Sequence, residues 1–318
     1  MSSIPVNIIV GQYWYMTLKP ARRVCFRPSP SCTALLASQT VQMSANTGTV
    51  SGHGQEAKDD GAPSGAALQE AGLTAADKPL ICVDLDDVLS QTNRVVGEWH
   101  NDRYGTNMTL EDFHYYYYWR NPYWGTPDET FRKVDQFYST PRLYEAPPVE
   151  GALEGVKALR NLGFRLVLVT ARQIRELPRT REWVDRYFNG IFEDIVCTGM
   201  SQETLADEAL LITKLSKADV CKKLGAKLMI DDSVENALKC IQADPPVPIL
   251  LFGDYEWNKR SGNYKHIEDE MSFDERMKRE GGRKWWHDDD VKIPEDAPLT
   301  RVNNWEEIVQ WVEKNLKS

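Results

Sequence analysis

Five apolar runs of strand length alternate with helical patterns between residues 79 and 253, and this alternation constrains the fold more than any other feature of the chain. The runs are LICVDL (80–85), FRLVLVTA (164–171), EDIVC (193–197), AKLMID (226–231) and VPILLFG (247–253). Continuous apolar character indicates strands that are buried on both faces, as in parallel sheets covered by helices. We therefore predict an α/β fold with a Rossmann-like, doubly wound parallel sheet.

Helical patterns fill the intervals between the runs. Apolar residues recur every three residues across 153–162, and Gly163 follows as a residue that can end a helix. The stretch TREWVDRYF (180–188) carries an apolar stripe. The stretch SKADVCKKLG opens with the capping-box pair Ser216 and Asp219 and ends on a glycine. Each pattern predicts a helix that crosses over between strands.

One long segment interrupts this rhythm. Residues 93–148 contain no strand-like run, but they carry helical stripes and many aromatic residues, among them HYYYYWRNPYW (114–124). We predict a small helical cap here, inserted after the first strand of a core formed by residues 79–92 and 149–318. Most of the aromatic side chains are expected to pack cap against core, with Tyr118 or Trp124 as candidates to reach a substrate ring.

Residues 1–78 differ from the rest of the chain. The second half of this segment is rich in Ser, Gly, Ala and Thr, which predicts a disordered linker. Residues 1–55 contain three arginines and no acidic residue, a composition typical of a mitochondrial transit peptide. The alternative is a disordered tail without a targeting signal, or a start of translation at Met16 or Met43. Both interpretations stand, so the predicted location is mitochondrial or cytoplasmic.

The charge distribution restricts the partners. Residues 1–55 carry four of the 38 basic residues and none of the 47 acidic ones, so the rest of the chain has a net charge of −13. This acidity argues against a nucleic-acid polymer or an anionic membrane as the main partner. No stretch approaches the roughly 18 apolar residues of a membrane span. A small anionic substrate would need cations placed locally in its site.

The six cysteines form no C-x-x-C motif. Cys82 and Cys197 lie in apolar, strand-like runs, where a reduced cysteine acts as a small hydrophobic residue. This usage predicts a reducing compartment and no zinc site.

Three carboxylates crowd into four residues behind the first apolar run. Asp84 and Asp86 are two residues apart, so in extended backbone they face the same way. Asp87 then points elsewhere, and we expect it to cap the next helix. Such crowding is unfavourable unless a cation offsets it.

Further polar groups follow other strands. Thr170 ends the second run, and Asp231 and Asp232 follow LMI. Because the carboxyl ends of parallel strands meet at one edge of the sheet, we expect all these groups in one crevice. Oxygen ligands suit Mg²⁺, and a phosphate dianion would also need a lysine beside it. Lys217, at a predicted helix start, is the candidate, with Lys214 as its competitor.

These features together resemble the haloacid dehalogenase-like superfamily of phosphatases. The family's first motif is D-x-D-x-[TV], its second a hydrophobic strand ending in Thr, its third a helix-start lysine, and its fourth an acidic pair. The matching positions, in the same order, are Asp84–Val88, Thr170, Lys217 and Asp231–Asp232. The resemblance covers roughly residues 79–253.

The resemblance implies a role for each matching residue. Asp84 would attack phosphorus and form a transient aspartyl-phosphate. Asp86 would protonate the leaving group and then activate water. The side chain of Thr170, the backbone amide of Ala171 and the ammonium group of Lys217 would hold the phosphoryl oxygens.

The resemblance also implies a Mg²⁺ site. Its ligands would be the side chain of Asp84, the backbone carbonyl of Asp86 and the side chain of Asp232, while Asp231 would support the ligands from behind. Arg172 follows the second motif. It is interpreted either as a partner of a substrate anion or as a salt-bridge partner of one of the clustered aspartates.

Within the superfamily, the likeness is closest to the 5′(3′)-deoxyribonucleotidase group. Those enzymes carry a small helical cap after the first motif, and other stretches also resemble theirs. These are LYEAPPVEGALEGVKAL (143–159), WVDRYFNGIFEDIVCT (183–198), LMIDD (228–232) and NNWEEIVQWVEKNL (303–316). Two features depart from the group: Arg172 stands where Pro is usual, and residues 254–299 are longer than their counterpart. The pair Trp285 and Trp286 in that segment is expected to cover an apolar edge.

The predicted function is that of a Mg²⁺-dependent phosphomonoester hydrolase, with a small phosphate ester such as a (deoxy)nucleoside monophosphate as substrate. The alternatives are a phosphatase of another small ester or of a phosphoprotein, and a non-catalytic phosphate-binding or scaffold protein of the same fold.

Overall fold

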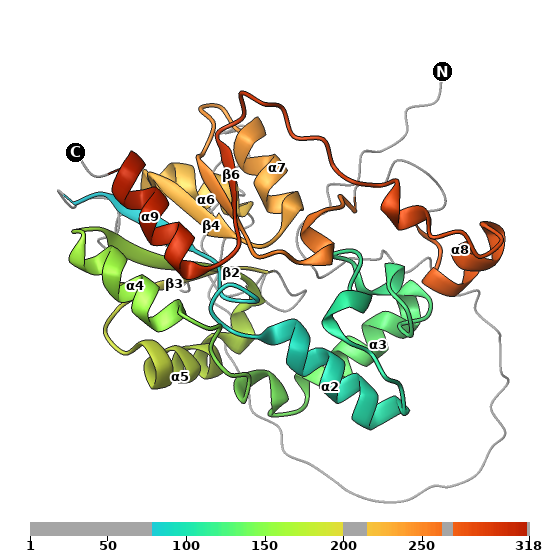
Figure 1. Cartoon of the computed structure of the whole chain (residues 1–318). Coiled ribbons are helices and arrows are strands. Elements are labelled where there is room, and N and C mark those ends of the chain that lie inside the picture. Colours follow the sequence, from blue (N-terminus) through green and yellow to red (C-terminus); the bar gives the residue numbers. More distant parts are fainter. Residues whose placement is uncertain (1–77, 200–214, 263–269, 317–318) are drawn as a thin grey trace, which may run out of the picture. The chain divides into compact units, whose positions relative to one another are not determined.

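Parallel strands at the centre of the protein form one sheet with helices on both faces (Figure 1). The structure is a computed structural model that describes residues 78–199, 215–262 and 270–316. Residues 1–77 of the predicted leader, and Lys214, lie outside the described residues. The predicted division into core and cap domains stays a prediction.

The strands are β1 (Leu80–Val83), β2 (Arg165–Gln173), β3 (Ile195–Gly199), β4 (Leu228–Asp231), β5 (Ile249–Phe252) and β6 (Leu299–Val302). The α-helices are α2 (Thr92–Tyr104), α3 (Pro127–Tyr138), α4 (Ala152–Asn161), α5 (Leu177–Phe188), α6 (Lys217–Leu224), α7 (Val234–Gln242), α8 (Phe273–Arg279) and α9 (Trp305–Asn315). Short 3₁₀ helices are η1 (Leu110–Asp112), η2 (Tyr118–Arg120), η3 (Arg142–Tyr144), η4 (Ile174–Glu176), η6 (Glu256–Asn258) and η8 (Trp285–His287).

The sheet has the order β3-β2-β1-β4-β5-β6, and every described pair of neighbours is parallel. The chain moves outward from β1 through β2 to β3, then returns to the other side of β1 with β4. The order therefore reverses between β1 and β4, and this reversal leaves a crevice at the carboxyl ends of those two strands. The doubly wound parallel sheet predicted from the sequence is confirmed.

Alternate residues of each strand enter different cores. Ile81 and Val83 of β1 pack with residues of α4, α5 and α9 on one face. Leu80 and Cys82 pack with residues of α6 and α7 on the other. Because both faces are covered, the strands need apolar residues at every position, which explains the continuous runs in the sequence. Cys82, Cys197, Cys221 and Cys240 are buried in these cores and form no disulfide.

The helix signals of the sequence act as predicted where the chain is described. In α6, the Ser216 side chain accepts from the amide of Asp219, the Asp219 side chain accepts in return, and Gly225 closes the helix at φ 65°. Because Gly225 adopts the left-handed conformation without a steric cost, it is suited to the end of a helix. None of the described helices is long and apolar enough to cross a membrane.

The segment between β1 and β2 is helical, as predicted. Two α-helices, α2 and α3, lie together at one end of the sheet, and η1, η2 and η3 link them to each other and to the core (Figure 1). A capping box of Thr126 and Glu129, with Pro127 in the first turn, starts α3. The aromatic side chains of residues 113–119 connect this segment to the core and to the segment after β5.

Two elements near the C-terminus were not predicted from the sequence. Strand β6 is a short edge strand in which Val302 is buried, Arg301 is exposed and the other two residues are partly buried, so it lacks a continuous apolar run. Helix α8 belongs to the long segment after β5, where Phe273, Trp285, Trp286 and Tyr115 form a separate small cluster. The two tryptophans are 2% and 5% exposed, so they cover an apolar surface as predicted.

Candidate active site

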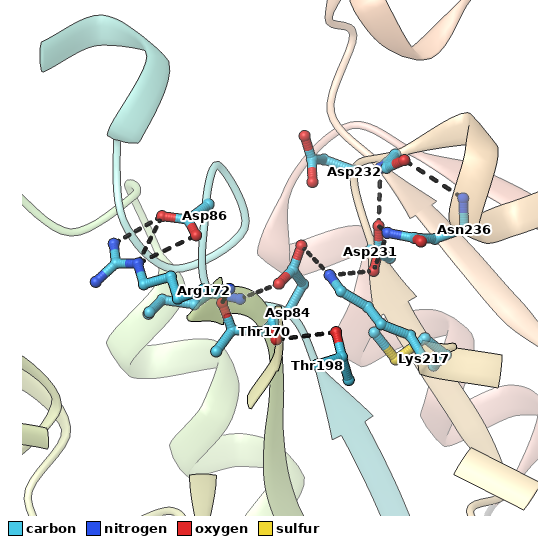
Figure 2. Close-up of polar contacts among 12 residues, drawn as sticks. Asp84, Asp86, Thr170, Arg172, Thr198, Lys217, Asp231, Asp232 and Asn236 are labelled. Atoms are coloured by element: carbon cyan, nitrogen blue, oxygen red, sulfur yellow. Dashed lines mark hydrogen bonds and ion pairs between the residues drawn. The ribbon is translucent and has the colours of Figure 1, made fainter. Parts of the chain in front are cut away.

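Acidic side chains from two neighbouring strands meet at the carboxyl edge of the sheet (Figure 2). Asp84 directly follows β1, Asp231 is the last residue of β4, and Asp232 comes next. The amide of Asp84 donates to the carbonyl oxygen of Ile230 at 2.9 Å, which holds the two strand ends at the same level. These carboxylates therefore lie at the point where the strand order reverses, the usual ligand site of an open α/β sheet.

Lys217 joins two of the three carboxylates. It is the first residue of α6, its side chain is 3% exposed, and its Nζ lies 2.6 Å from Oδ2 of Asp84 and 2.8 Å from Oδ2 of Asp231. The capping box at Ser216 starts the helix so that this side chain points into the crevice. The ion pairs strongly favour the charged ammonium, so they raise the pKa of Lys217 although burial opposes this.

Lys217 is therefore the described lysine that contacts the clustered carboxylates, a position for which the sequence offered both Lys217 and Lys214. Its competitor Lys214 lies outside the described residues. Lys222, five residues further along α6, is exposed, and its Nζ donates to the carbonyl oxygen of Asp244. Of these two residues of α6, only Lys217 reaches the carboxylates.

Asp231 is fully buried and its oxygens are held from several sides. Besides the bond from Lys217, it accepts from the amide of Ser233 at 2.9 Å and from Nδ2 of Asn236 at 3.0 Å. A carboxylate with this many internal donors is fixed in orientation. The arrangement suits a residue that orients Lys217 and the start of α7.

Asp232 faces the crevice more openly. Its Oδ2 accepts from the indole Nε1 of Trp257 at 2.6 Å. One oxygen each of Asp84, Asp231 and Asp232 lies within 4.8 Å of the others. Burial raises the pKa of Asp84 and of Asp232, and repulsion from Asp231 raises both further; Lys217 works against this rise. Three carboxylates with one lysine thus leave an excess of negative charge in a buried place.

Asp86 belongs to a different ion pair. Nη2 of Arg172 donates to Oδ1 of Asp86 at 2.7 Å, and Nε lies 3.2 Å from each carboxylate oxygen. The hydroxyl of Thr92 donates to Oδ1 at 2.6 Å. Burial would raise the pKa of Asp86, but the charge and hydrogen bonds of Arg172 outweigh it and hold the pKa below its usual range. Of the two interpretations of Arg172, the structure has the salt bridge to an aspartate.

Asp87 acts at a helix start, as predicted. Its Oδ1 accepts from the backbone amide of Asn93, in the first turn of α2, at 2.9 Å. The backbone of Asp87 has φ 57°, a left-handed conformation that aspartate tolerates better than most residues. The turn directs Asp86 and Asp87 to different partners.

Thr170 lies on β2, beside β1. It is fully buried, and its Oγ1 accepts from the amide of Arg172 at 3.1 Å. The pairing of β2 with β3 shifts register between Thr170 and Gln173, which marks a bulge of the kind common at active sites. A β-carbon at Gly199 would lie 2.1 Å from the carbonyl oxygen of Ala171, so β3 approaches this bulge as closely as it does only because that residue is glycine.

The strand ends open into a small cavity, called here the acidic pocket. It is lined by Asp84, Asp86, Asp87, Thr92, Asn93, Tyr116, Ala171 and Asp232. Asp84 and Asp86 thus face the same space, as their spacing predicted. The structure brings all eight site residues singled out in the sequence to this crevice or directly behind it, and their roles stay predictions.

A second, more apolar cavity adjoins the first and is called the aromatic pocket. It is lined by Asp86, Thr92, Val96, Tyr116, Tyr117, Tyr118, Trp119, Trp124, Thr130, Phe131, Val134, Phe137 and Tyr138. The rings of Tyr118 and Trp124 stack at 4.4 Å, and the Tyr118 hydroxyl donates to Oδ1 of Asn93. Both candidates for a substrate contact therefore line the cavity. Asp86, Thr92 and Tyr116 border both pockets.

Sequence reasoning missed several residues of the site. Thr92 bonds Asp86 and Trp257 bonds Asp232. Tyr116 borders both pockets, although it was grouped with the other aromatic residues. Asn236 had a usable signal, since a polar residue five positions after Asp231 lies on the first turn of the next helix. Trp257 had none, because it comes from a segment 25 residues beyond Asp232.

A strand-end carboxylate paired with a buried lysine, beside a second acidic pair, is the arrangement of the haloacid dehalogenase-like phosphatases. The chain belongs to the family of the 5′ nucleotidase, deoxy (pyrimidine), cytosolic type C protein (NT5C), whose model matches residues 78–244, just over half of the chain. The protein is thus a phosphatase of a 5′-nucleotidase family, and the resemblance seen in the sequence is confirmed. The match covers β1 through α7 and includes all eight predicted site residues.

Other comparisons add little. No curated protein sequence matches the chain. Similar solved structures include a predicted phosphatase from Clostridium acetobutylicum, with 15% identity, covering 75% of this chain and 100% of that chain at a TM-score of 0.42. A hydrolase of the same superfamily from Deinococcus radiodurans, with bound phosphate and sodium, has 14% identity, 77% and 99% coverage and a TM-score of 0.40.

Proposed function

We propose that the protein is a Mg²⁺-dependent 5′-nucleotidase that hydrolyses (deoxy)nucleoside monophosphates through an aspartyl-phosphate on Asp84. The observation that carries the proposal is the position of Asp84 at the floor of the acidic pocket. Its Oδ2 is held 2.6 Å from Nζ of Lys217, and its Oδ1 accepts from the amide of Leu85 at 2.7 Å. A carboxylate fixed in this way is ready to attack a phosphoryl group in the pocket.

In the first step an oxygen of Asp84 forms a bond to phosphorus as the ester bond to the leaving oxygen breaks. The ammonium of Lys217 offsets the negative charge gathered by nucleophile and phosphate. The Thr170 hydroxyl already accepts from the amide of Arg172, so its proton is left to donate to a phosphoryl oxygen. The amide of Ala171, which lines the pocket, is the other proposed donor.

Asp86 is proposed to give the leaving oxygen its proton and then to take a proton from the water that attacks the aspartyl-phosphate. The charge of Arg172 keeps Asp86 ionised in the free protein, the form that accepts a proton from water. A phosphate dianion entering beside it works the other way, because nearby negative charge raises the pKa of a carboxyl group. Both protonation states are thus available at different stages.

The side chains at the crevice fit a hard divalent cation. Asp84 and Asp232 both line the acidic pocket, and burial and repulsion from neighbouring carboxylates raise the pKa of each, a cost that a bound cation removes. We propose that the side chains of Asp84 and Asp232 and the backbone carbonyl of Asp86 hold Mg²⁺, and that Asp231 supports them without touching it. The ion would neutralise phosphoryl charge while the substrate is bound.

The proposal of a nucleotide substrate is supported by the aromatic pocket. It adjoins the acidic pocket at Asp86, on the side where the leaving group of a bound phosphate ester would lie. The half-buried ring of Tyr118 offers flat apolar surface to a planar base, and Trp124, which is 0% exposed, stacks against it and supports it. A sugar phosphate would leave this surface unused.

The test is phosphate release from a panel with and without Mg²⁺. The panel contains deoxy- and ribonucleoside 5′- and 3′-monophosphates, a sugar phosphate and a phosphopeptide, and Asp84→Asn is the control variant. Release from nucleoside monophosphates that needs both Mg²⁺ and Asp84 supports the proposal. Release mainly from the phosphopeptide or the sugar phosphate would show that the substrate is not a nucleotide. No release from a folded protein that binds Mg²⁺ would favour the binding or scaffold alternative.

We also propose that the protein works inside the cell, in mitochondria or in the cytoplasm. The proposal rests on the composition of residues 1–55 and on the reduced cysteines of the core. Fractionation of cells that express the whole chain with a C-terminal tag separates the two locations. A variant that starts at Met43 tests whether the preceding residues direct the protein to mitochondria.

A further inference from the structure

Arg172 is buried to an unusual degree for an arginine beside a polar cavity. Its side chain is 1% exposed, and the guanidinium is held on two sides. Nε and Nη2 face the carboxylate of Asp86 (Figure 2). On the other side, Nη1 donates to Oγ1 of Thr180 at 3.3 Å. The ring of Tyr144 lies 5.8 Å from the guanidinium carbon. A planar guanidinium group held on two sides in this way fixes its carboxylate partner in one orientation.

The same arrangement argues against Arg172 as a direct phosphate ligand. Among the described residues, its neighbour Ala171 lines the acidic pocket but Arg172 lines neither that pocket nor the aromatic one. Its fork is turned toward Asp86 and Thr180 rather than toward the crevice. Any effect of Arg172 on the reaction therefore passes through Asp86.

The two oxygens of Asp86 are unequally occupied. Oδ1 accepts from the Thr92 hydroxyl at 2.6 Å, from Nη2 of Arg172 at 2.7 Å and from Nε at 3.2 Å. Among the described residues, the contact of Oδ2 is with Nε of Arg172 alone, at 3.2 Å. Because a carboxylate oxygen has two lone pairs, Oδ1 is saturated and Oδ2 retains capacity for a further partner.

Asp86 also borders both pockets, and its side chain is 25% exposed. In a phosphate ester the oxygen that joins phosphorus to the leaving group would lie between these two cavities. The free side of Oδ2 is the part of Asp86 that can meet this oxygen.

We infer that Arg172, together with Thr92, is a positioning residue that presents Oδ2 of Asp86 to the leaving-group oxygen. The inference rests on the proposed function. Asp86 is ionised in the free protein, so in this proposal Oδ2 takes up a proton from water when the phosphate ester binds beside it. The bond from phosphorus to the ester oxygen then breaks as a bond to Asp84 forms, and the proton on Oδ2 passes to the departing oxygen. Arg172 affects only the last of these events, so its importance depends on how much the leaving group needs a proton.

Two substrates separate this role from others. The sugar alkoxide of 2′-deoxyuridine 5′-monophosphate needs a proton to leave, whereas the phenolate of 2,4-dinitrophenyl phosphate does not. The readout is release of the leaving group in the first turnover, which isolates transfer to Asp84 from the later attack of water. Arg172→Met is compared with Arg172→Lys, which keeps the charge but loses the fork, and with Arg175→Met as an exposed control nearby.

Arg172→Met is expected to slow the first turnover about 10- to 100-fold with the nucleotide and less than about threefold with the dinitrophenyl ester, within the range of general acid catalysis. Arg172→Lys should recover only part of the loss, and the inhibition constant of inorganic phosphate should stay within about twofold. In an Asp86→Asn background, Arg172→Met should cause no further loss, because both changes remove the same interaction.

Thr92→Val provides a second variant that leaves the buried ion pair intact and removes one donor to Oδ1. Thr92→Val should also slow the first turnover more with the nucleotide than with the dinitrophenyl ester, but by a smaller factor, and this test remains even if Arg172→Met fails to fold. Equal slowing of both substrates, weaker binding of phosphate, or additive losses in the Asp86→Asn background would overturn the positioning role while the nucleotidase proposal stands. A folded wild-type protein that is inactive on both compounds would overturn the proposed function and this inference with it.

Discussion

Replacement of Lys217 by methionine tests the electrostatic description of the crevice most directly. Nζ of Lys217 lies 2.6 Å and 2.8 Å from oxygens of Asp84 and Asp231, and all three side chains are buried. At an effective dielectric constant near 20, each contact amounts to roughly 6 kcal/mol of attraction before desolvation is counted. Desolvation of the ammonium offsets most of this, so the net contribution is much smaller than the sum.

Removal of one partner from a buried ion pair typically costs about 3–5 kcal/mol, because the other charge is left uncompensated. In Lys217→Met two carboxylates lose their cation while Asp232 still repels them. We expect the free energy of unfolding at pH 7 to fall by about 3–5 kcal/mol, a large part of the roughly 5–15 kcal/mol of a typical domain. The urea midpoint should fall by roughly 1–2 M.

The matched control is Lys222→Met on the same helix. Lys222 is exposed and bonds a backbone carbonyl, so its replacement should cost less than about 1 kcal/mol. The assay is urea denaturation of both variants without added metal, at pH 7 and at pH 5. Burial and the neighbouring carboxylates already raise the pKa of Asp84, and loss of Lys217 raises it further. A proton on Asp84 then relieves the repulsion, so the cost should shrink at pH 5.

Phosphate release provides a second readout. Lys217→Met should lose at least about 10²-fold in turnover, the usual scale for loss of one group that stabilises developing charge. Equal stability of the two methionine variants, or a cost at pH 5 as large as that at pH 7, would refute the reasoning.

Three other perturbations have expected outcomes. Without metal at pH 7, Asp232→Asn should be more stable than wild type, because the repulsion among the carboxylates is relieved. Saturating Mg²⁺ should raise the melting temperature of this variant less than that of wild type. Calorimetry measures both melting temperatures, and an equal rise in the two proteins would contradict the proposed metal site. Burial lowers the pKa of His100 to about 4, so as the pH falls below 6.5 the unfolded chain takes up a proton before the folded protein does. Between pH 7 and pH 5 the free energy of unfolding should therefore fall by up to about 2 kcal/mol more in wild type than in His100→Gln. Urea denaturation measures both proteins, and an equal fall in the two would contradict this prediction. Gly155→Ala puts a β-carbon 2.4 Å from the Trp305 ring and should cost about 1–3 kcal/mol, whereas Gly97→Ala, with its nearest atom at 3.7 Å, should be neutral or stabilising; similar melting temperatures for the two would show that α4 and α9 adjust without cost.

Local patterns in the sequence were sufficient for most of the core. Runs such as LICV and ILLF predicted buried strands because both sides of a covered parallel sheet exclude water, and the capping box at Ser216 located the start of α6. Strand β6 escaped prediction because an edge strand is half exposed and its sequence, LTRV, has no apolar run. Such a strand forms because the edge of β5 offers unpaired backbone groups, which are not visible in the strand's own residues.

The sequence by itself determined that Asp84, Asp86, Asp231 and Asp232 follow buried strands, and in a parallel sheet this is enough to bring them to one edge. Only the tertiary structure decided which cation each carboxylate received: Lys217 for the first strand end, and Arg172, with Thr92, for Asp86. It also brought Trp257 to Asp232 across 25 residues. The physical reason is that burial depends on local patterns of apolar residues, whereas ion pairs and hydrogen bonds depend on distances of a few tenths of an ångström that are set by the packing of segments remote in the chain.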